Sequence, residues 1–230
     1  MDDYFSNHYA SINDINLNSE ESIRNWYRES AEVYEREFLP YAGTLQNKKV
    51  MELGCGIGGL LNFLKMKGCE KLLGIDSSEE QLSICRKFVT DKVILASAEE
   101  FLESNKQKFD LIILYDLIEH FKKDSVISIF ELIHKTLSER GRVIIRTPNM
   151  GYLFAPYSRY IDFTHEIGFT EESIKQVLRS AGFKNISVEN SYIGKKRLWL
   201  NKKINNLIKF IYNYRVPKIV TSNMIAIAKK

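Results

Sequence analysis

Between residues 48 and 149, short apolar segments alternate with longer segments whose apolar residues recur at helical spacing. This pattern predicts an alternating series of strands and helices, with strands at residues 50–53, 71–76, 93–96, 110–115 and 143–146. Five β-α units in series predict an α/β fold with a doubly wound, mostly parallel sheet, because crossovers between parallel strands are right-handed. Ligands of such sheets bind outside the carboxyl ends of the strands, near the switch in strand order.

The flanking segments complete a predicted sheet of seven strands. Residues 1–45 are predicted to form an N-terminal helical cap, and residues 46–193 the core. Within the core, residues 150–169 contain six aromatic residues and no helical period, which predicts a long loop or lid. Residues 194–230 are predicted to contain a basic helical insertion before the last strand.

Local signals mark several helix ends. Ser77 with Glu80 predicts a capping box for the helix after the second strand. Thr170 is predicted to cap a helix that Gly182 closes, and Gly141 is predicted to end the helix before the fifth strand.

Composition restricts the class of protein. The chain has 230 residues, so it can bury about 70% of its unfolded surface. Its N-terminus lacks the apolar region of a signal peptide, and its longest apolar runs are far too short to cross a bilayer. The three cysteines, Cys55, Cys69 and Cys85, lack metal-ligand spacing. We therefore expect a soluble protein of the reducing cytoplasm.

The net charge of +4 conceals an asymmetry. Residues 194–230 contain ten of the 33 Lys and Arg residues and none of the 29 acidic residues, so the rest of the chain is net acidic. Such a basic segment could face solvent, an anionic substrate, a membrane or a nucleic acid. The acidic core and the lack of an RNA-binding module argue against nucleic acid, whereas peripheral membrane contact is left open.

The turn after the first strand, MELGCGIGGLL, fits two cofactor patterns. Gly54, Gly56 and Gly59 form G-x-G-x-x-G, which is typical of a dinucleotide site. Glu52 begins a second pattern, E-x-G-x-G-x-G, that ends at Gly58. An ionised Glu52 would repel a pyrophosphate but tolerate a cation, so it favours a sulfonium cofactor. The alternative is a carboxylate that only braces the turn.

Two further features bear on the cofactor. Asp76, at the end of the second strand, can accept hydrogen bonds from both hydroxyls of a ribose, which NAD and S-adenosylmethionine share. The alternative is a charge that stabilises the next helix N-terminus. The fourth strand reads FDLIILYDLIEHF, and an NAD enzyme has no need of its D-x-x-E-H cluster.

Together, E-x-G-x-G-x-G, Asp76 and the acidic end of the fourth strand resemble class I S-adenosylmethionine-dependent methyltransferases, over roughly residues 30–190. The resemblance implies a Rossmann-like fold, S-adenosylmethionine as cofactor and S-adenosylhomocysteine as product. The implied cofactor-binding residues are Glu52, Gly54, Cys55, Gly56, Gly58, Asp76, Ser77, Ser97, Ala98, Glu99 and Tyr115.

A narrower resemblance lies further along the chain. RTPNMG and RYIDFTHEIGFTEESIKQVLRSAGF are similar to bacterial methyltransferases of capsule and O-antigen biosynthesis, which modify sugar hydroxyls. This implies O-methyl transfer to a sugar, nucleotide-linked in our interpretation. Aromatic faces pack against sugar rings and Arg clamps phosphate. The candidate acceptor-binding residues are Arg146, Asn149, Tyr157, Arg159, Tyr160 and Asp162.

A sugar hydroxyl is a poor nucleophile, so a positioned base would accelerate transfer by about 10²–10⁴-fold. His120, four residues after Asp116, and His165 in DFTHE are the candidate bases, and Asp116 is assigned to the same catalytic group. The alternatives are structural: His120 would cap the next loop, and His165 would pin the lid. His8 and His134 are expected to have no role.

A metal site is a further alternative. Asp116, Glu119 and His120 resemble the E-x-x-E-H pattern of quinone O-methyltransferases, which is associated with a divalent ion. Asp replaces the first Glu and reaches less far, so we expect no metal.

Two other functions are left open. One is methylation of a quinone-like or lipid-linked acceptor, with the basic segment on a membrane. The other is a non-catalytic subunit that binds S-adenosylmethionine without turnover. The sequence determines neither the sugar, nor its hydroxyl, nor the oligomeric state, for which a homodimer is one option.

Overall fold

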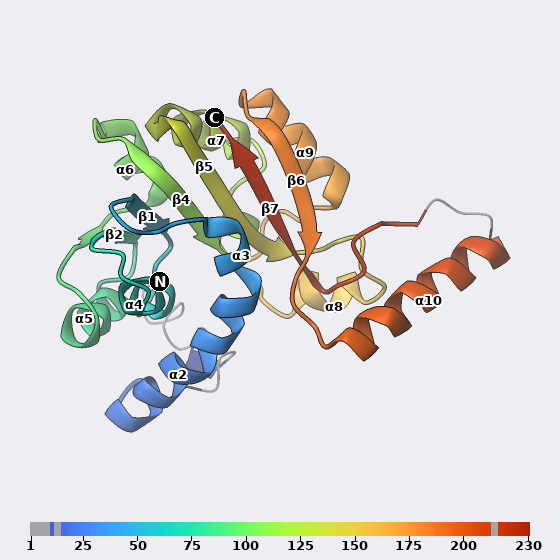
Figure 1. Ribbon diagram of the computed structural model, residues 1–230, viewed down its shortest axis with the longest axis horizontal. Coiled ribbons are helices and arrows are strands. Elements are labelled where there is room, and N and C mark those ends of the chain that lie inside the picture. Colours follow the sequence, from blue (N-terminus) through green and yellow to red (C-terminus); the bar gives the residue numbers. More distant parts are fainter. Residues whose placement is uncertain (1–9, 12–14, 213–215) are drawn as a thin grey trace. The chain divides into compact units, whose positions relative to one another are not determined.

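Seven strands form one sheet in the order β3-β2-β1-β4-β5-β7-β6 (Figure 1). They are β1 (Lys49–Leu53), β2 (Lys71–Asp76), β3 (Val93–Leu95), β4 (Phe109–Tyr115), β5 (Leu137–Pro148), β6 (Lys184–Asn190) and β7 (Asn223–Lys229). β1 to β3 pair in parallel, whereas β7 pairs antiparallel with β5 and β6. The order reverses between β1 and β4, which is the switch point of a doubly wound sheet. The predicted fold is confirmed.

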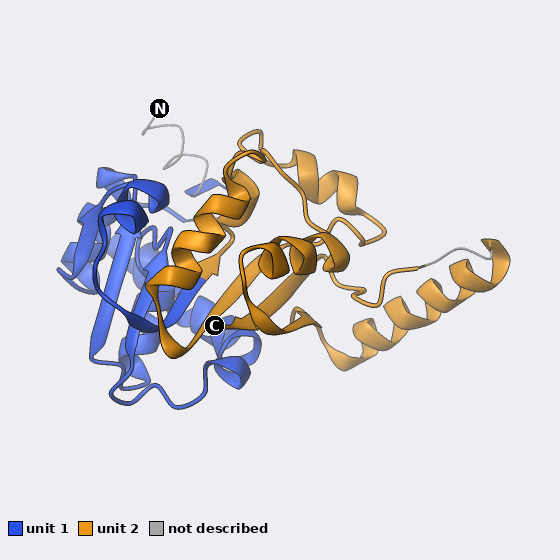
Figure 2. Ribbon diagram, turned by 90° about the horizontal axis from the view of Figure 1, so that it is seen from above, with its two compact units in different colours: residues 1–113 blue, residues 114–230 orange. Residues whose placement is uncertain are grey.

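The computed structural model describes residues 10–11, 15–212 and 216–230. It divides into two compact units, residues 1–113 and 114–230 (Figure 2). The described helices are α2 (Glu20–Glu37), α3 (Leu39–Ala42), α4 (Gly59–Met66), α5 (Glu79–Phe88), α6 (Ala98–Ser104), η1 (Ile118–His120), α7 (Val126–Thr136), α8 (Ala155–Tyr160), α9 (Glu171–Ser180) and α10 (Lys195–Tyr212). The predicted boundaries of cap, core and C-terminal segment stay predictions.

In the first unit, the core forms between the strands and the helices that connect them. Leu53 of β1, Ile75 of β2 and Leu61 of α4 are completely buried. α2 packs on α4 where a Cβ on Gly59 would lie 2.5 Å from the Trp26 ring. The last glycine of the dinucleotide pattern therefore permits helix–helix contact, as only a residue without a side chain fits there.

In the second unit, α7 and α9 pack against each other, and α9 also contacts β6 and β7. Phe130 and Ile133 of α7 and Leu178 of α9 are completely buried. The recurrence of Phe130 and Ile133 at helical spacing is the signal that predicts α7, whereas the cap Thr170 and the closing Gly182 predict α9. All three cysteines of the chain are buried and unpaired.

Two predictions about helix ends differ from the structure. Ser78, and not Ser77, caps α5, because its side chain accepts from the Gln81 N–H at 3.3 Å. Gly141 lies inside β5 and ends no helix. Its carbonyl accepts from Lys230 N at 3.1 Å, so sheet pairing overrides the local preference of glycine for a turn. The predicted cap Thr170 and the closing Gly182 are confirmed.

The segment at residues 150–169, which was predicted to be a long loop or lid and is called the lid below, contains a short helix, α8, where no helix is predicted. Six residues are too few to show a hydrophobic period. Pro156 lies in the first turn, where a missing N–H costs nothing. The predicted basic helical insertion is confirmed as α10. None of the helices in the described ranges is long and apolar enough to cross a membrane.

Candidate functional site

The turn between β1 and α4 has a backbone that glycine adopts readily. Gly54, Gly56 and Gly58 have φ values of 71°, 53° and 86°. The Gly54 and Cys55 N–H groups donate to the Ile75 carbonyl at 2.8 and 3.0 Å, which fastens the turn to β2. The turn leads directly into the N-terminus of α4, where helix N–H groups favour a polar ligand.

Glu52 lies at the start of this turn as a buried carboxylate. Its side chain is only 3% exposed, and its Oε2 has no hydrogen-bond partner among the described residues. Burial, with the nearby Cys85 and Asp76, raises the pKa of Glu52 well above its ordinary value. A buried carboxylate oxygen without a partner is costly, and a cationic ligand would reduce that cost.

The Asp76 carboxylate accepts hydrogen bonds from the glycine turn and from the start of the helix after β2. Its Oδ2 accepts from the Gly56 N–H at 2.8 Å, and its Oδ1 accepts from the Ser78 N–H at 2.9 Å. Burial raises the pKa of Asp76, and these N–H groups oppose the shift. Asp76 therefore braces the glycine turn and, through Ser78, also contacts the N-terminus of α5, which is where the alternative interpretation placed its charge. Each oxygen has a further lone pair, so the carboxylate could also accept from a ribose.

The other predicted cofactor residues of the first unit differ in what they offer. The Cys55 side chain is buried over Gly74 of β2, which leaves its backbone as the part able to meet a ligand. Ser97 is the N-cap of α6, and its hydroxyl accepts from Glu100 N at 3.2 Å. Ala98 and Glu99 follow in the first turn of that helix, and Ser77 is exposed.

In the second unit, the end of β4 is tied to β5. Asp116 has φ 51°, its N–H donates to the Arg146 carbonyl at 3.0 Å, and its carboxylate forms an ion pair with the Arg146 guanidinium. The Arg146 Cζ lies 4.7 Å from the centre of the Tyr115 ring. These contacts hold Asp116 to Arg146, whereas Glu119 has a different side-chain partner.

Glu119 joins η1 to β5 and to the lid. Its buried carboxylate accepts a hydrogen bond from Thr147 Oγ1 at 2.9 Å, and its carbonyl accepts from Glu166 N at 2.8 Å and Ile167 N at 3.1 Å. Burial, and next the charge of Asp116, raise the pKa of Glu119 to about 8.

His120 is oriented by a short chain of hydrogen bonds. Thr164 Oγ1 donates to Asp162 Oδ1 at 2.6 Å and lies 2.9 Å from His120 Nδ1. Because the single Thr164 hydroxyl proton goes to the carboxylate, Thr164 accepts from a protonated Nδ1. The Thr164 carbonyl, 3.3 Å from the same nitrogen, favours the same tautomer. In neutral His120 the basic lone pair therefore lies on Nε2.

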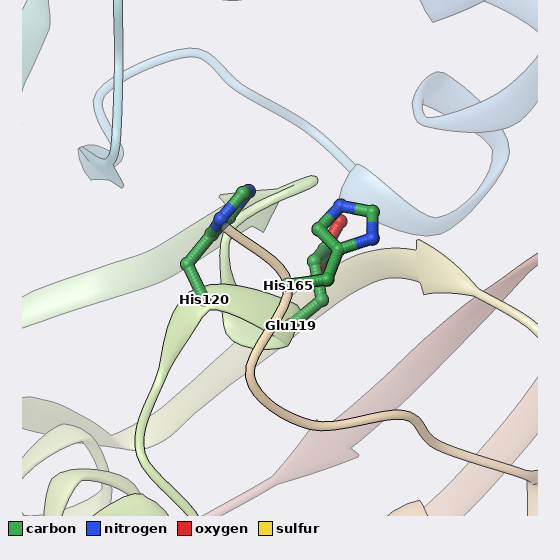
Figure 3. Close-up of side chains that lie close together, drawn as sticks. All are labelled: Glu119, His120 and His165. Atoms are coloured by element: carbon green, nitrogen blue, oxygen red, sulfur yellow. The ribbon is translucent and has the colours of Figure 1, made fainter. Parts of the chain in front are cut away.

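His165 lies beside His120, as Figure 3 shows for both rings and Glu119. The two ring centres are 5.0 Å apart, and His165 Nε2 lies 3.9 Å from Asp162 Oδ2. One nitrogen or oxygen from each of Glu119, His120 and His165 lies within 4.8 Å of the others. The two candidate bases thus belong to one cluster, built from η1 and the lid.

The predicted acceptor-binding residues are brought together only in part. Asn149 is a structural hub: its Nδ2 donates to the Ile219 and Thr221 carbonyls at 3.1 and 3.0 Å, and its Oδ1 accepts from Gly151 N at 2.9 Å. Arg159 donates to the carbonyls of His165 and Glu166 within the lid. Tyr157 and Tyr160 are exposed on α8.

Sequence reasoning missed two residues of this cluster, Thr147 and Thr164. Thr164 lies inside the DFTHE segment, and that motif could have drawn attention to it. No local sequence pattern distinguishes Thr147. His134 packs its ring 5.0 Å from Phe183, as a structural histidine would. His8 lies outside the described residues.

Known proteins resemble the chain in sequence and fold. Residues 23–188 match the family described as "Methyltransferase domain". A ubiquinone biosynthesis O-methyltransferase of Hydrogenovibrio crunogenus is 26% identical over 160 residues, which cover 64% of this chain and 65% of that protein. The alignment thus spans less than two thirds of the relative.

Solved structures share the fold. A SAM-dependent methyltransferase from Archaeoglobus fulgidus, where SAM is S-adenosylmethionine, has a TM-score of 0.70 at 22% identity. The match covers 89% of this chain and 94% of that chain. The plantazolicin methyltransferase BamL, solved with SAH, has a TM-score of 0.60 at 21% identity, covering 91% and 89%. With the family match over most of its length, the chain belongs to the methyltransferase-domain family and has the class I α/β methyltransferase fold.

Proposed function

We propose that this chain is an S-adenosylmethionine-dependent O-methyltransferase that acts on a hydroxyl of a small molecule. The observation that carries the proposal is the buried Glu52 carboxylate, with an oxygen that lacks a described hydrogen-bond partner, at the start of the glycine turn. Such a group suits a cationic cofactor and opposes a pyrophosphate. The family match supports the same conclusion.

The residues of the first unit that would hold the cofactor are those of the glycine turn and the end of β2. Glu52 and the turn from Gly54 to Gly58 would hold the amino-acid portion, and Asp76 would hold the ribose through its remaining lone pairs. When bound, S-adenosylmethionine supplies an activated methyl carbon. The protein then needs mainly to align the acceptor and exclude water.

In the second unit, His120 is the candidate base that the geometry favours. Asp162 and Thr164 orient it with Nδ1 protonated, so Nε2 would take the proton of the acceptor hydroxyl. His165 lies 3.9 Å from Asp162 and makes a weaker contact with it. The same arrangement speaks against a non-catalytic subunit, which would not need an oriented base.

Substitutions separate the two histidines. We expect His120→Asn to lower kcat by about 10²-fold or more, whereas His165→Asn should lower it less. Thr164→Val, which removes the hydroxyl acceptor of Nδ1–H, should shift the pH profile of kcat and lower kcat less than His120→Asn. Near-normal turnover in both histidine variants would contradict a histidine base, and binding of S-adenosylhomocysteine to each variant controls for folding.

For the acceptor, we propose a sugar hydroxyl of a nucleotide-linked sugar used in capsule or O-antigen synthesis. Its support is the resemblance of the segment that contains DFTHE, which supplies Asp162, Thr164 and His165 of the cluster. The test is a screen of nucleotide-sugars with S-adenosylmethionine, read by mass spectrometry as the gain of one methyl group. Methylation of catechols or quinols, with no methylated sugar, would reject the sugar.

A quinone-like or lipid-linked acceptor is the second candidate. It is favoured by the Hydrogenovibrio relative and by the Glu119, His120 and His165 cluster, whose one oxygen and two nitrogen donors suit a divalent transition metal. An ion there would occupy His120 and displace its role as a base. If this is right, a chelator abolishes turnover, added Zn²⁺ or Mn²⁺ restores it, and Glu119→Gln weakens the metal affinity. Full activity in chelator would leave the histidine base in place.

For its surroundings, we propose a cytoplasmic enzyme that binds a small-molecule acceptor and no nucleic acid. The acidic character of residues 1–193 supports the exclusion of nucleic acid. A homodimer is an open alternative that analytical ultracentrifugation of the purified chain decides.

A further inference from the structure

α10 presents two different faces, and the residues that the structure describes cover only one of them. The half-buried residues are Leu198, Asn201, Asn205 and Ile208, which follow one another at helical spacing. Asn201 Nδ2 donates to the Val220 carbonyl at 2.9 Å, and Asn205 Nδ2 donates to the Pro217 carbonyl at 2.6 Å. These bonds set the rotation of the helix, with this face turned toward the segment that leads into β7.

The apolar side chains of α10 lie mainly on another face. Leu200, Ile204, Leu207 and Ile211 recur at spacings of four, three and four residues, and we call them the apolar stripe. Their exposed fractions are 50%, 38%, 56% and 60%. Trp199 and Phe210, beside the stripe, are also exposed, and no residue of α10 is buried. Figure 1 shows the helix extending away from β6 and β7.

The charge of α10 is of one sign. The helix carries six Lys or Arg residues and no Asp or Glu, and all six basic side chains are exposed. Lys196 and Lys203 lie on the side of the stripe where Trp199 also lies, and Lys203 Nζ is 5.6 Å from the centre of the Trp199 ring. An apolar stripe flanked by cations and an indole is the pattern of a helix that lies in a lipid interface.

The charge of α10 also indicates which kind of partner can cover its exposed face. A second copy of α10 would bring six further positive charges against these and no negative ones, so like-charge repulsion opposes pairing. A nucleic acid would satisfy the cations but leave the apolar stripe in water. An anionic bilayer satisfies both the cations and the stripe.

We propose that α10 binds the surface of an anionic lipid bilayer, with the apolar stripe in the acyl boundary and the lysines at the headgroups. The helix lies along the surface and does not cross it. This proposal goes beyond methyl transfer and does not depend on the acceptor being a lipid.

The test is flotation of the full chain with vesicles of phosphatidylcholine containing phosphatidylglycerol, compared with vesicles of phosphatidylcholine alone. We expect binding to the anionic vesicles and at least about tenfold weaker binding to the neutral ones, lost as salt screens the charges. The double substitution Leu200→Ser with Leu207→Ser keeps the charge and should weaken binding by about tenfold or more. Lys196→Gln with Lys203→Gln should weaken it and reduce the salt dependence.

The matched control is Val33→Ser with Ile127→Ser, which removes two exposed apolar side chains from α2 and α7 and should leave vesicle binding unchanged. The proposal is overturned if the wild-type chain does not float, if the stripe variant floats equally well, or if the stripe variant instead dissolves a dimer seen by ultracentrifugation. Binding of S-adenosylhomocysteine by every variant shows that the fold is intact. Failure to float thus leaves the proposed methyl transfer standing, and failure to methylate leaves the membrane contact standing.

Discussion

Glu52 and Asp76 are two acidic residues of the same unit with opposite surroundings. Backbone N–H groups satisfy both oxygens of Asp76, whereas Glu52 Oε2 lacks a described hydrogen-bond partner. Asp76 therefore contributes to the turn without a ligand, and Glu52 is a cost until a cation arrives. A site that pays stability for ligand complementarity is a common compromise in proteins.

Replacing Glu52 by Gln tests this cost. Because the folded-state pKa of Glu52 is raised, mainly by burial and next by Cys85 and Asp76, its stabilising contribution is present below the ordinary Glu value of 4.5 and is lost as the pH rises toward the folded value. Glu52→Gln should remove up to about 1.4 kcal/mol per pH unit of that decline in unfolding free energy. Urea titrations of the ligand-free protein across the pH range measure it.

Glu52→Gln should bind S-adenosylhomocysteine more weakly than the wild-type chain, although we expect it to be more stable than the wild type at neutral pH. Glu103→Gln, on the exposed side of α6, is the control and should change neither property. An unchanged pH dependence in Glu52→Gln would show that the carboxylate is not under strain.

Asn149 is a predicted acceptor-binding residue, but its hydrogen bonds indicate that it stabilises the fold. Asn149→Ala leaves the Ile219 and Thr221 carbonyls and the Gly151 N–H without their side-chain partner. We expect a loss of about 2–4 kcal/mol in unfolding free energy, from chemical denaturation. Asn206→Ala, at an exposed position of α10, should cost almost nothing. Loss of turnover without loss of stability would restore Asn149 as an acceptor ligand.

Helix ends and strand ends show how far local signals reach. Thr170 was predicted correctly because a capping residue acts within its own turn. Ser77 and Ser78 are both suitable caps, and which one serves depends on where β2 ends and Asp76 turns. Gly141 looked like a helix end, yet its place in β5 depends on pairing with the C-terminal residue, far along the chain.

The cap of α9 offers a prediction about a single element. Thr170→Ala removes the hydroxyl that accepts from Ser173 N at 3.2 Å and should lower the unfolding free energy by about 1 kcal/mol. Ser125 precedes α7 but forms no side-chain cap bond, so Ser125→Ala should change the stability by less than about 0.5 kcal/mol. Equal effects of the two substitutions would contradict the assignment of the cap.

For the molecule as a whole, ligand binding and stability are linked. If the fold holds S-adenosylhomocysteine, a concentration of about 100 Kd raises the unfolding free energy by about 2.7 kcal/mol. Thermal unfolding with S-adenosylhomocysteine and with NADH measures the difference. Asp76→Ala should abolish the gain, and Asp91→Ala, an exposed aspartate of the same unit, should retain it. Stabilisation by NADH alone would show that the cofactor is wrong.

The order of strands and helices could be predicted from the sequence, because burial of one face makes apolar residues recur with a regular period, and this period lies within a single segment. The glycine turn was readable for the same reason, since its backbone and its neighbour Glu52 lie within a few residues. The side-chain partners of His120 and Asp116 could not be predicted in this way. His120 meets Thr164 across 44 residues and Asp116 meets Arg146 across 30, and no pattern within one segment encodes such pairs. Packing of the lid on η1 brings His120 to Thr164, and so decides which nitrogen of His120 carries the proton, whereas pairing of β4 with β5 brings Asp116 to Arg146.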